Sequence, residues 1–237
     1  MEINEDRKRE LKELQFKLGY IFSNLSLLQT ALTHSTYVNE SQDKDINDNE
    51  RLEFLGDSVL GFAISDFLLQ KFPTYTEGML SKLKAYIVSE RHISQIAKDI
   101  DLGLYLYVGK GEEISGGRNK PSILTNTYEA VIGGIYLDGG LSMAKRAIMK
   151  TMKEKIMTMG KKMLVPDYKS MLQEYAQKNF GEIPSYEVVT ETGQNHNPTF
   201  EVQVLIKNEV YAVAKAGSKK KAEQKAAYEV LKEKNII

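Results

Sequence analysis

Three carboxylate side chains share one face of a predicted helix in the first half of the chain. Glu50, Glu53 and Asp57 stand three and four residues apart, and the apolar residues between them keep the spacing of a helix. Like charges at this spacing repel by about 0.2–0.5 kcal/mol per pair. A bound hard cation would offset that repulsion, because Mg²⁺ takes oxygen ligands. The spacing alone also fits a solvated acidic helix face, which is what most runs of charge form.

A second predicted helix, at residues 121–140, offers oxygen ligands in the same way. Asn126 and Glu129 are three residues apart on it and therefore share a face. Both helices contain interior glycines: Gly56 and Gly61 in the first, Gly133 and Gly134 in the second. An interior glycine costs a helix about 1 kcal/mol relative to alanine and indicates a place where another backbone comes close. If the two helices pack together, their oxygen ligands meet in one cluster.

The composition excludes several other kinds of site. The 237 residues include no Cys, which excludes disulfides and thiolate metal sites, and His34, His92 and His196 are too scattered for a zinc motif. Hydrophobic residues make up 42% of the chain and charged residues 27%, as in soluble globular proteins. No apolar run reaches the length of a membrane span, and the charged first ten residues are unlike a secretory signal. We therefore expect a cytoplasmic protein in which any metal is held by oxygen.

Periodicity divides the chain into two domains of different class. Helical apolar spacing recurs through residues 1–158, which predicts an all-α domain. Residues 159–166 lose this spacing and end in proline, as a linker does. Within residues 167–237, a helical segment is followed by three alternating segments and a last helix. This order predicts an α+β domain of the α-β-β-β-α kind.

The last predicted helix begins with three cations. Lys219, Lys220 and Lys221 occupy its first turn, where the helix dipole disfavours positive charge. A phosphate held by the helix N-terminus and the ammonium groups would explain them. Residues 167–237 contain 10 Lys, no Arg and 10 Asp plus Glu, so any basic surface must be this local patch. Solvated lysines are the alternative interpretation.

Two stretches carry a resemblance to known families. Asn49-Glu-Arg-Leu-Glu-Phe-Leu-Gly-Asp-Ser-Val-Leu60 resembles the signature of the ribonuclease III family, and residues 31–37 and 102–140 are similar to further elements of that family. Gly217-Ser-Lys-Lys-Lys-Ala-Glu-Gln-Lys-Ala-Ala227 resembles the second-helix motif of double-stranded-RNA-binding domains. The resemblance implies an endonuclease domain over residues 1–158 and an RNA-binding domain over residues 167–237.

The resemblance implies Mg²⁺-dependent hydrolysis of double-stranded RNA that leaves 5′-phosphate and 3′-hydroxyl ends with a short 3′ overhang, with Mn²⁺ as a substitute. By residue match, Glu53, Asn126 and Glu129 would ligate metal, and Asp57 would ligate it or position the attacking water. Glu50 would add to the acidic cleft. Two ions about 4 Å apart are the usual arrangement for such chemistry.

One of these residues departs from the family pattern, which usually has Asp where this chain has Asn126. An Asn carbonyl can ligate a hard cation, but it carries no charge and cannot act as a base. We therefore expect weaker metal affinity than with Asp. The alternative function is a catalytically impaired double-stranded-RNA-binding protein that uses the nuclease fold as a scaffold.

The family resemblance also implies partners. It implies a homodimer in which Phe54 inserts into the partner subunit, although an ordinary core Phe is the alternative. In the second domain, Gln173 and Glu174 match residues that reach minor-groove 2′-hydroxyls, and His196 matches one that enters a second minor groove. Such domains span about 16 base pairs, largely by shape. The implied substrates are ribosomal RNA precursors and messenger RNA, with no small-molecule cofactor and no membrane partner.

Overall fold

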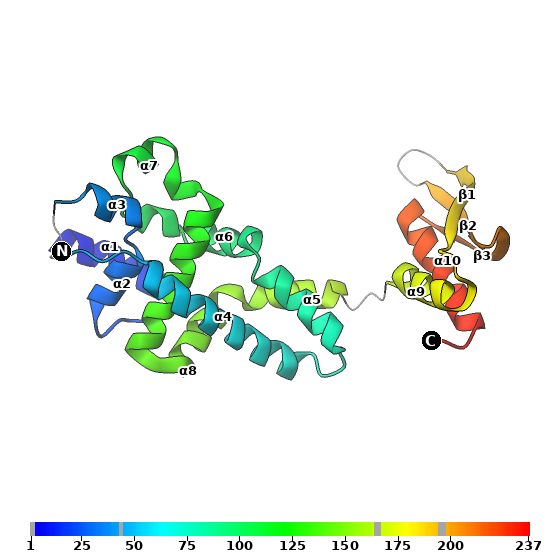
Figure 1. Ribbon diagram of the computed structural model, residues 1–237, viewed down its shortest axis with the longest axis horizontal. Helices are drawn as coiled ribbons and strands as arrows, with labels where there is room; N and C mark the ends of the chain where they lie inside the picture. Colours follow the sequence, from blue (N-terminus) through cyan, green and yellow to red (C-terminus); the bar gives the residue numbers. More distant parts are fainter. Residues whose placement is uncertain (1–2, 43–44, 164–166, 194–197) are drawn as a thin grey trace. The chain divides into compact units, whose positions relative to one another are not determined.

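The computed structural model describes residues 3–42, 45–163, 167–193 and 198–237. The chain forms two compact units, Met1–Leu164 and Val165–Ile237 (Figure 1). Each unit has its own cluster of buried apolar side chains. Within the described residues, no helix is long and apolar enough to cross a membrane.

The first unit is helical, as the sequence predicts. Its described β pairing is limited to one bridge between Thr33 and Tyr107. The elements in chain order are α1 (Glu5–Leu18), α2 (Leu25–Ala31), α3 (Ser35–Glu40), α4 (Glu50–Lys71), α5 (Glu77–Ile87), α6 (Glu90–Asp99), the short 3₁₀ helix η1 (Leu102–Tyr105), α7 (Lys110–Ile114), a second 3₁₀ helix η2 (Gly117–Asn119) and α8 (Pro121–Met163).

The packing of α4 against α8 forms the centre of this unit (Figure 1). Leu60 and Ile64 of α4 and Tyr128 and Ile132 of α8 are fully buried in one apolar cluster. Burying each Leu or Ile side chain contributes about 1.5–3 kcal/mol, so this contact holds the two helices in a fixed register. The side chains that project from the crossing are therefore held in place as well.

The helix α8 extends further than the sequence predicts. Residues 159–163 were predicted to begin a linker, but they continue the helix to Met163. Gly160 lies directly against the ring of Phe72, and the Tyr75 hydroxyl donates a hydrogen bond of 2.6 Å to the Gly160 carbonyl. Close packing against Phe72 thus requires a glycine at this position of the helix. Backbone angles outside the helical range occur earlier, at Gly140, where α8 is kinked.

The second unit has the predicted α-β-β-β-α order. Its antiparallel sheet has the strand order β1-β2-β3, and Val204 and Ile206 of the central strand are buried under the two helices. The helices contribute Leu172 and Val230 to the same cluster. The elements are α9 (Tyr168–Phe180), β1 (Ser185–Thr192), β2 (Thr199–Ile206), β3 (Glu209–Ala216) and α10 (Lys219–Glu233).

Candidate functional site

The start of α4 is anchored to the segment that follows α2. The backbone N–H of Asn49 donates to the Thr33 carbonyl at 2.9 Å, and its buried side chain donates to the Ala31 carbonyl at 3.3 Å. Asp48 accepts a hydrogen bond from the Glu50 N–H at 3.1 Å. These bonds fix the rotation of α4 about its axis, and so they fix which of its residues face α8.

The crossing of α4 and α8 is a direct contact between backbones. A Cβ atom added at Gly56 would overlap the carbonyl of Glu129, and one added at Gly133 would overlap the carbonyl of Leu52. The predicted close approach is therefore confirmed at both positions. It is wrong at Gly61, where an added Cβ would meet only the end of the Lys84 side chain, 3.8 Å away.

This crossing brings the predicted acidic residues of the two helices together. Burial and, to a smaller extent, the charges of Asp57 and Glu53 together raise the pKa of Glu129 to about 7. The pKa of Glu53 is also raised, first by burial and then by Glu50, although a hydrogen bond from the Asn126 side chain partly opposes this. Half-buried Glu53 and Glu129 and exposed Asp57 therefore repel one another across a short distance.

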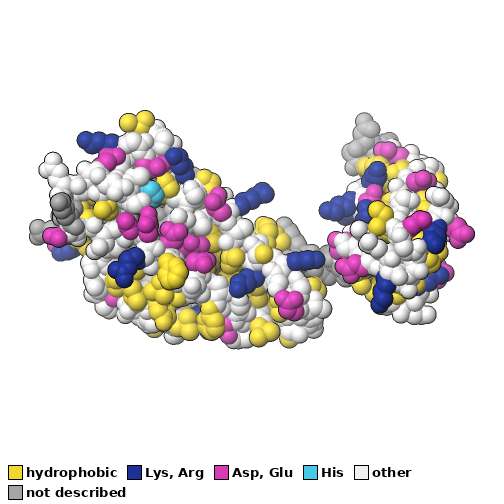
Figure 2. Space-filling model, in the orientation of Figure 1, with side chains coloured by type: hydrophobic (Ala, Val, Ile, Leu, Met, Phe, Trp, Pro, Cys, Tyr) yellow, Lys and Arg dark blue, Asp and Glu magenta, His cyan; other side chains and the backbone are white. Residues whose placement is uncertain are grey.

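The donor set at the crossing fits a hard divalent cation. Carboxylate and amide oxygens are the ligands that such ions take, and a cation would relieve the repulsion that raises both pKa values. Glu50 is exposed on the same side of α4. Asp and Glu side chains gather over this part of the surface (Figure 2). Within the described ranges, no three His, Asp or Glu side chains are placed to hold a metal ion by themselves.

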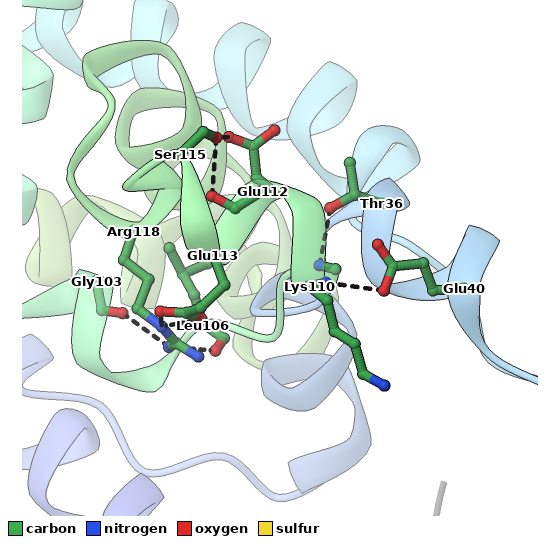
Figure 3. Close-up of polar contacts among 10 residues, drawn as sticks. Thr36, Glu40, Gly103, Leu106, Lys110, Glu112, Glu113, Ser115 and Arg118 are labelled. Carbon is green, nitrogen blue, oxygen red and sulfur yellow. Dashed lines mark hydrogen bonds and ion pairs between the residues drawn. The ribbon is translucent and has the colours of Figure 1, made fainter.

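The glycine-rich segment before α8 is a structural support rather than a phosphate-binding loop. Its N–H groups are already used: Gly109 donates to the Thr36 hydroxyl at 3.0 Å, and Lys110 and Gly111 donate to the Glu40 carboxylate at 2.8 and 3.4 Å (Figure 3). These bonds tie the segment to α3 and so position the start of α8.

The side chain of Arg118 closes the other end of this segment. Its guanidinium donates to the carbonyls of Leu106 and Gly103 at 2.6 and 3.2 Å and is paired with Glu113 (Figure 3). The bonds hold η1, α7 and η2 in one compact loop directly ahead of Pro121. Asn126 and Glu129 therefore enter the site from a helix whose beginning is fixed.

Phe54 lies on the surface of α4 and is 80% exposed. This excludes the interpretation of Phe54 as an ordinary core residue of the single chain. Hydrophobic side chains cover much of the same helix (Figure 2), and Phe62 and Leu69 on it are also exposed. A hollow at the beginning of the same helix is lined by apolar residues such as Leu27 and Leu55 and by the charged residues Glu50 and Arg51. The surface of α4 thus offers an exposed aromatic side chain and, at its first turns, a hollow of mixed polarity.

In the second unit, the predicted RNA-contacting residues that the structure describes lie in the first turn of α10 and in the middle of α9. Lys219, Lys220 and Lys221 are exposed in the first turn of α10, which Ser218 caps by accepting a hydrogen bond from the Lys221 N–H at 3.3 Å. Lys220 and Gln173 line the same small hollow between α10 and α9. Glu174 is exposed on α9, and His196 lies outside the described residues.

Two further residues that line this hollow, Lys169 and Tyr186, belong to no motif in the sequence. Lys169 forms a 2.7 Å ion pair with Glu223, and its ammonium lies 4.4 Å from the centre of the Tyr186 ring. The Tyr186 hydroxyl is buried and has no hydrogen-bond partner among the described residues. The contact between Tyr186 and Lys169 joins segments that are apart in the chain, so no local sequence pattern predicts it.

Comparison with known proteins gives matches over both units. Residues 24–156 match the family model described as Ribonuclease-III-like, and residues 168–234 match the Double-stranded RNA binding motif. The chain is similar to "Ribonuclease 3" of Nitratiruptor (42% identity, 94% of this chain and 96% of that protein) and to "Ribonuclease 3" of Borreliella burgdorferi (45%, 96% and 92%). A solved nuclease domain of ribonuclease III from Campylobacter jejuni, described as having flexibility in a region involved in dimer formation, matches with a TM-score of 0.56 at 40% identity, over 61% of this chain and 96% of that domain.

Proposed function

This chain belongs to the ribonuclease III family, and from that premise we propose that it is an Mg²⁺-dependent endoribonuclease that hydrolyses phosphodiester bonds of double-stranded RNA. The proposed products carry 5′-phosphate and 3′-hydroxyl groups at staggered ends. The observation that carries the proposal is the backbone contact between Gly56 and Glu129, which brings the acidic residues of α4 and α8 into one cluster.

Each residue of the cluster has a distinct part in the proposed reaction. Glu53, Asn126 and Glu129 would hold the divalent cation, which when bound supplies activation of water and stabilisation of the departing 3′ oxygen. Asp57 is exposed, and it orients the attacking water by accepting a hydrogen bond from it. Glu50 adds negative charge at the mouth of the site. Glu129 is the most buried carboxylate of the cluster. Water would therefore replace it as a metal ligand less easily than it would replace the others.

Replacing Glu129 by Gln tests this assignment. Glu129→Gln keeps the shape of the side chain but removes its charge, so we expect RNA cleavage in Mg²⁺ to be lost while binding of a long RNA duplex is retained. Glu154→Gln, an exposed acidic residue on the same helix, serves as the control and should cleave normally. Turnover by Glu129→Gln in Mg²⁺ would contradict the proposed ligand set.

A second candidate function rests on Asn126. The neutral amide of Asn126 supplies an oxygen ligand but no negative charge. A catalytically impaired double-stranded-RNA-binding protein could tolerate the loss of that charge. The structure favours the enzyme, because Glu53, Asp57 and Glu129 repel one another and a scaffold gains nothing from keeping them. We expect the natural chain to cleave a duplex in Mg²⁺ or Mn²⁺, and Asn126→Asp to do so at a lower ion concentration. If only the Asn126→Asp variant cleaves the duplex, the natural chain is instead a double-stranded-RNA-binding protein without cleavage activity.

The proposed substrates and setting follow from family membership. We assign ribosomal RNA precursors and messenger RNA as substrates, the cytoplasm as the location, and a homodimer as the active form. The exposed Phe54 supports the dimer.

A further inference from the structure

The second unit contains a larger hollow, lined in part by Lys220 and Lys221, that extends beyond the proposed contacts with an RNA duplex. It has a volume of about 840 Å³ and lies where the first turn of α9 meets the outward face of α10. Tyr168 and Tyr228 line it, with their rings in edge-to-face contact at a centroid distance of 4.9 Å. Both rings are partly exposed, so each offers surface to a ligand.

Three lysines and one tyrosine share this face of α10. Lys221, Lys225, Tyr228 and Lys232 are spaced by four, three and four residues, which places them on one side of the helix. The first three line the hollow, and the ammonium of Lys232 lies 6.0 Å from the centre of the Tyr228 ring. An aromatic surface beside lysines is the arrangement that proteins use for an unpaired base and its phosphate.

The two carboxylates in the hollow do not remove its attraction for phosphate. Asp167 already accepts hydrogen bonds from Gln224 at 2.7 Å and from the Ser170 hydroxyl at 2.8 Å, so it is occupied in capping α9. Glu229 is the other carboxylate, and it stands against the three lysines Lys220, Lys221 and Lys225. The local charge is therefore positive, although the domain as a whole is neutral.

The hollow is continuous with the candidate surface for double-stranded RNA. Lys220 and Gln224 line both this hollow and the smaller one that contains Gln173. A strand that leaves a duplex bound at Gln173 and Lys220 would therefore pass directly over Tyr168 and Tyr228. No other partner has to be invoked to fill the hollow.

We propose that this hollow binds an unpaired nucleotide next to the bound duplex. The base lies against Tyr168 and Tyr228, and its phosphate is held by Lys221 and Lys225. Because every base has an aromatic face, the site has little preference for sequence. The proposal rests on the proposed binding of double-stranded RNA, and it adds recognition of the point where the duplex ends or is interrupted.

The test compares two RNAs that differ only in unpaired nucleotides. Fluorescence anisotropy with the full chain, in EDTA to prevent cleavage, would measure the Kd for a blunt duplex of about 20 base pairs, longer than the span of one domain. The second RNA has the same duplex with three unpaired adenosines at one 3′ end. The expected result is an affinity about tenfold higher for the RNA with unpaired nucleotides, the effect of one stacked base.

Matched variants locate the effect. Tyr228→Ala should lose the tenfold advantage and keep its affinity for the blunt duplex, whereas Tyr228→Phe should keep the advantage because it retains the ring. Lys225→Ala should weaken binding of the RNA with unpaired nucleotides more than binding of the blunt RNA. Lys207→Ala removes an exposed lysine from the turn between β2 and β3, at the end of β3 opposite to the one that leads into the first turn of α10, and should leave the ratio of the two affinities unchanged.

Equal affinity of the natural chain for the two RNAs would overturn the inference. So would a tenfold advantage that survives in both Tyr228→Ala and Lys225→Ala. Failure of the natural chain to bind even the blunt duplex would instead overturn the proposed function, so the two failures are distinguishable.

Discussion

At the scale of single residues, Gly56 has the largest influence on the site, although it contributes no side chain. It lies between Glu53 and Asp57 in sequence and against the Glu129 carbonyl in space. The absence of a Cβ atom at this position lets two acidic segments approach more closely than their charges favour. The position of the acidic side chains is thus decided by a backbone contact.

Gly56→Ala should therefore disturb stability and activity together. The added methyl group must push α4 away from α8, and overpacking of this kind costs about 1–3 kcal/mol, more than the gain in helix propensity of about 1 kcal/mol. We expect a lower urea midpoint and reduced cleavage. Gly61→Ala is the matched control, because its new Cβ atom would meet only Lys84 at 3.8 Å. A Gly56→Ala protein with unchanged midpoint and activity would argue against the backbone contact.

The sequence could predict the members of the cluster, because three features of each residue are local: its type, its helical spacing and its match to a family motif. It could not separate Gly56 from Gly61, because both interrupt the same helix and only the path of α8 distinguishes them. It could not show that Phe54 is exposed, since the spacing of α4 places apolar residues on more than one side.

At the scale of elements, the ends of helices were the hardest features to predict. Alternation predicts strands over residues 199–206 and 209–216, and β2 and β3 have these bounds because alternation and a tight turn define both. The helix α8 continues to Met163 although the apolar spacing is lost from residue 159, because contacts with residues far away in sequence, such as Phe72 against Gly160, hold its last turn. Contacts between distant segments decide such positions, and no local pattern carries them.

Asp138 illustrates how one side chain orders a connection between elements. Its carboxylate accepts hydrogen bonds from the Tyr20 hydroxyl at 2.8 Å and from the N–H groups of Ser23 and Asn24 at 2.7 and 2.9 Å. Burial raises the pKa of Asp138, but these hydrogen bonds outweigh burial and hold the pKa below its ordinary value. The carboxylate therefore ties the segment between α1 and α2 to α8.

Asp138→Asn should lower the free energy of unfolding by about 1.5–3 kcal/mol at pH 7, the range for hydrogen bonds to a charged group. Because the pKa of Asp138 is lower in the folded state, its contribution is complete above the unfolded pKa of about 3.9 and is lost as pH falls through the folded value. The deficit of the variant should therefore shrink between pH 5 and pH 3. Urea unfolding at both pH values measures it, with Asp6→Asn, a highly exposed acid, as control. If the variant's loss of unfolding free energy is the same at both pH values, the negative charge of Asp138 does not contribute to stability.

At the scale of the whole molecule, the surface of α4 connects the site to assembly. The helix that carries Glu50, Glu53 and Asp57 also presents Phe54, 80% exposed and adjacent to Glu53 in the chain. A second copy that covers Phe54 would exclude water from a large aromatic side chain, which contributes about 1.5–3 kcal/mol per copy. In a symmetric dimer the same contact occurs twice, so its loss is doubled.

Phe54→Ala should for this reason weaken the proposed dimer by about 3–6 kcal/mol while leaving the fold of each subunit intact, because the exposed ring contributes little to the core of a single chain. Sedimentation velocity across a range of protein concentrations would measure the shift from dimer to monomer. Leu104→Ala is the control, since Leu104 is 74% exposed on η1, outside α4. If the Phe54→Ala protein remains a dimer at the lowest concentration at which the natural chain is dimeric, Phe54 is not the anchor, and its exposure on α4 needs another partner.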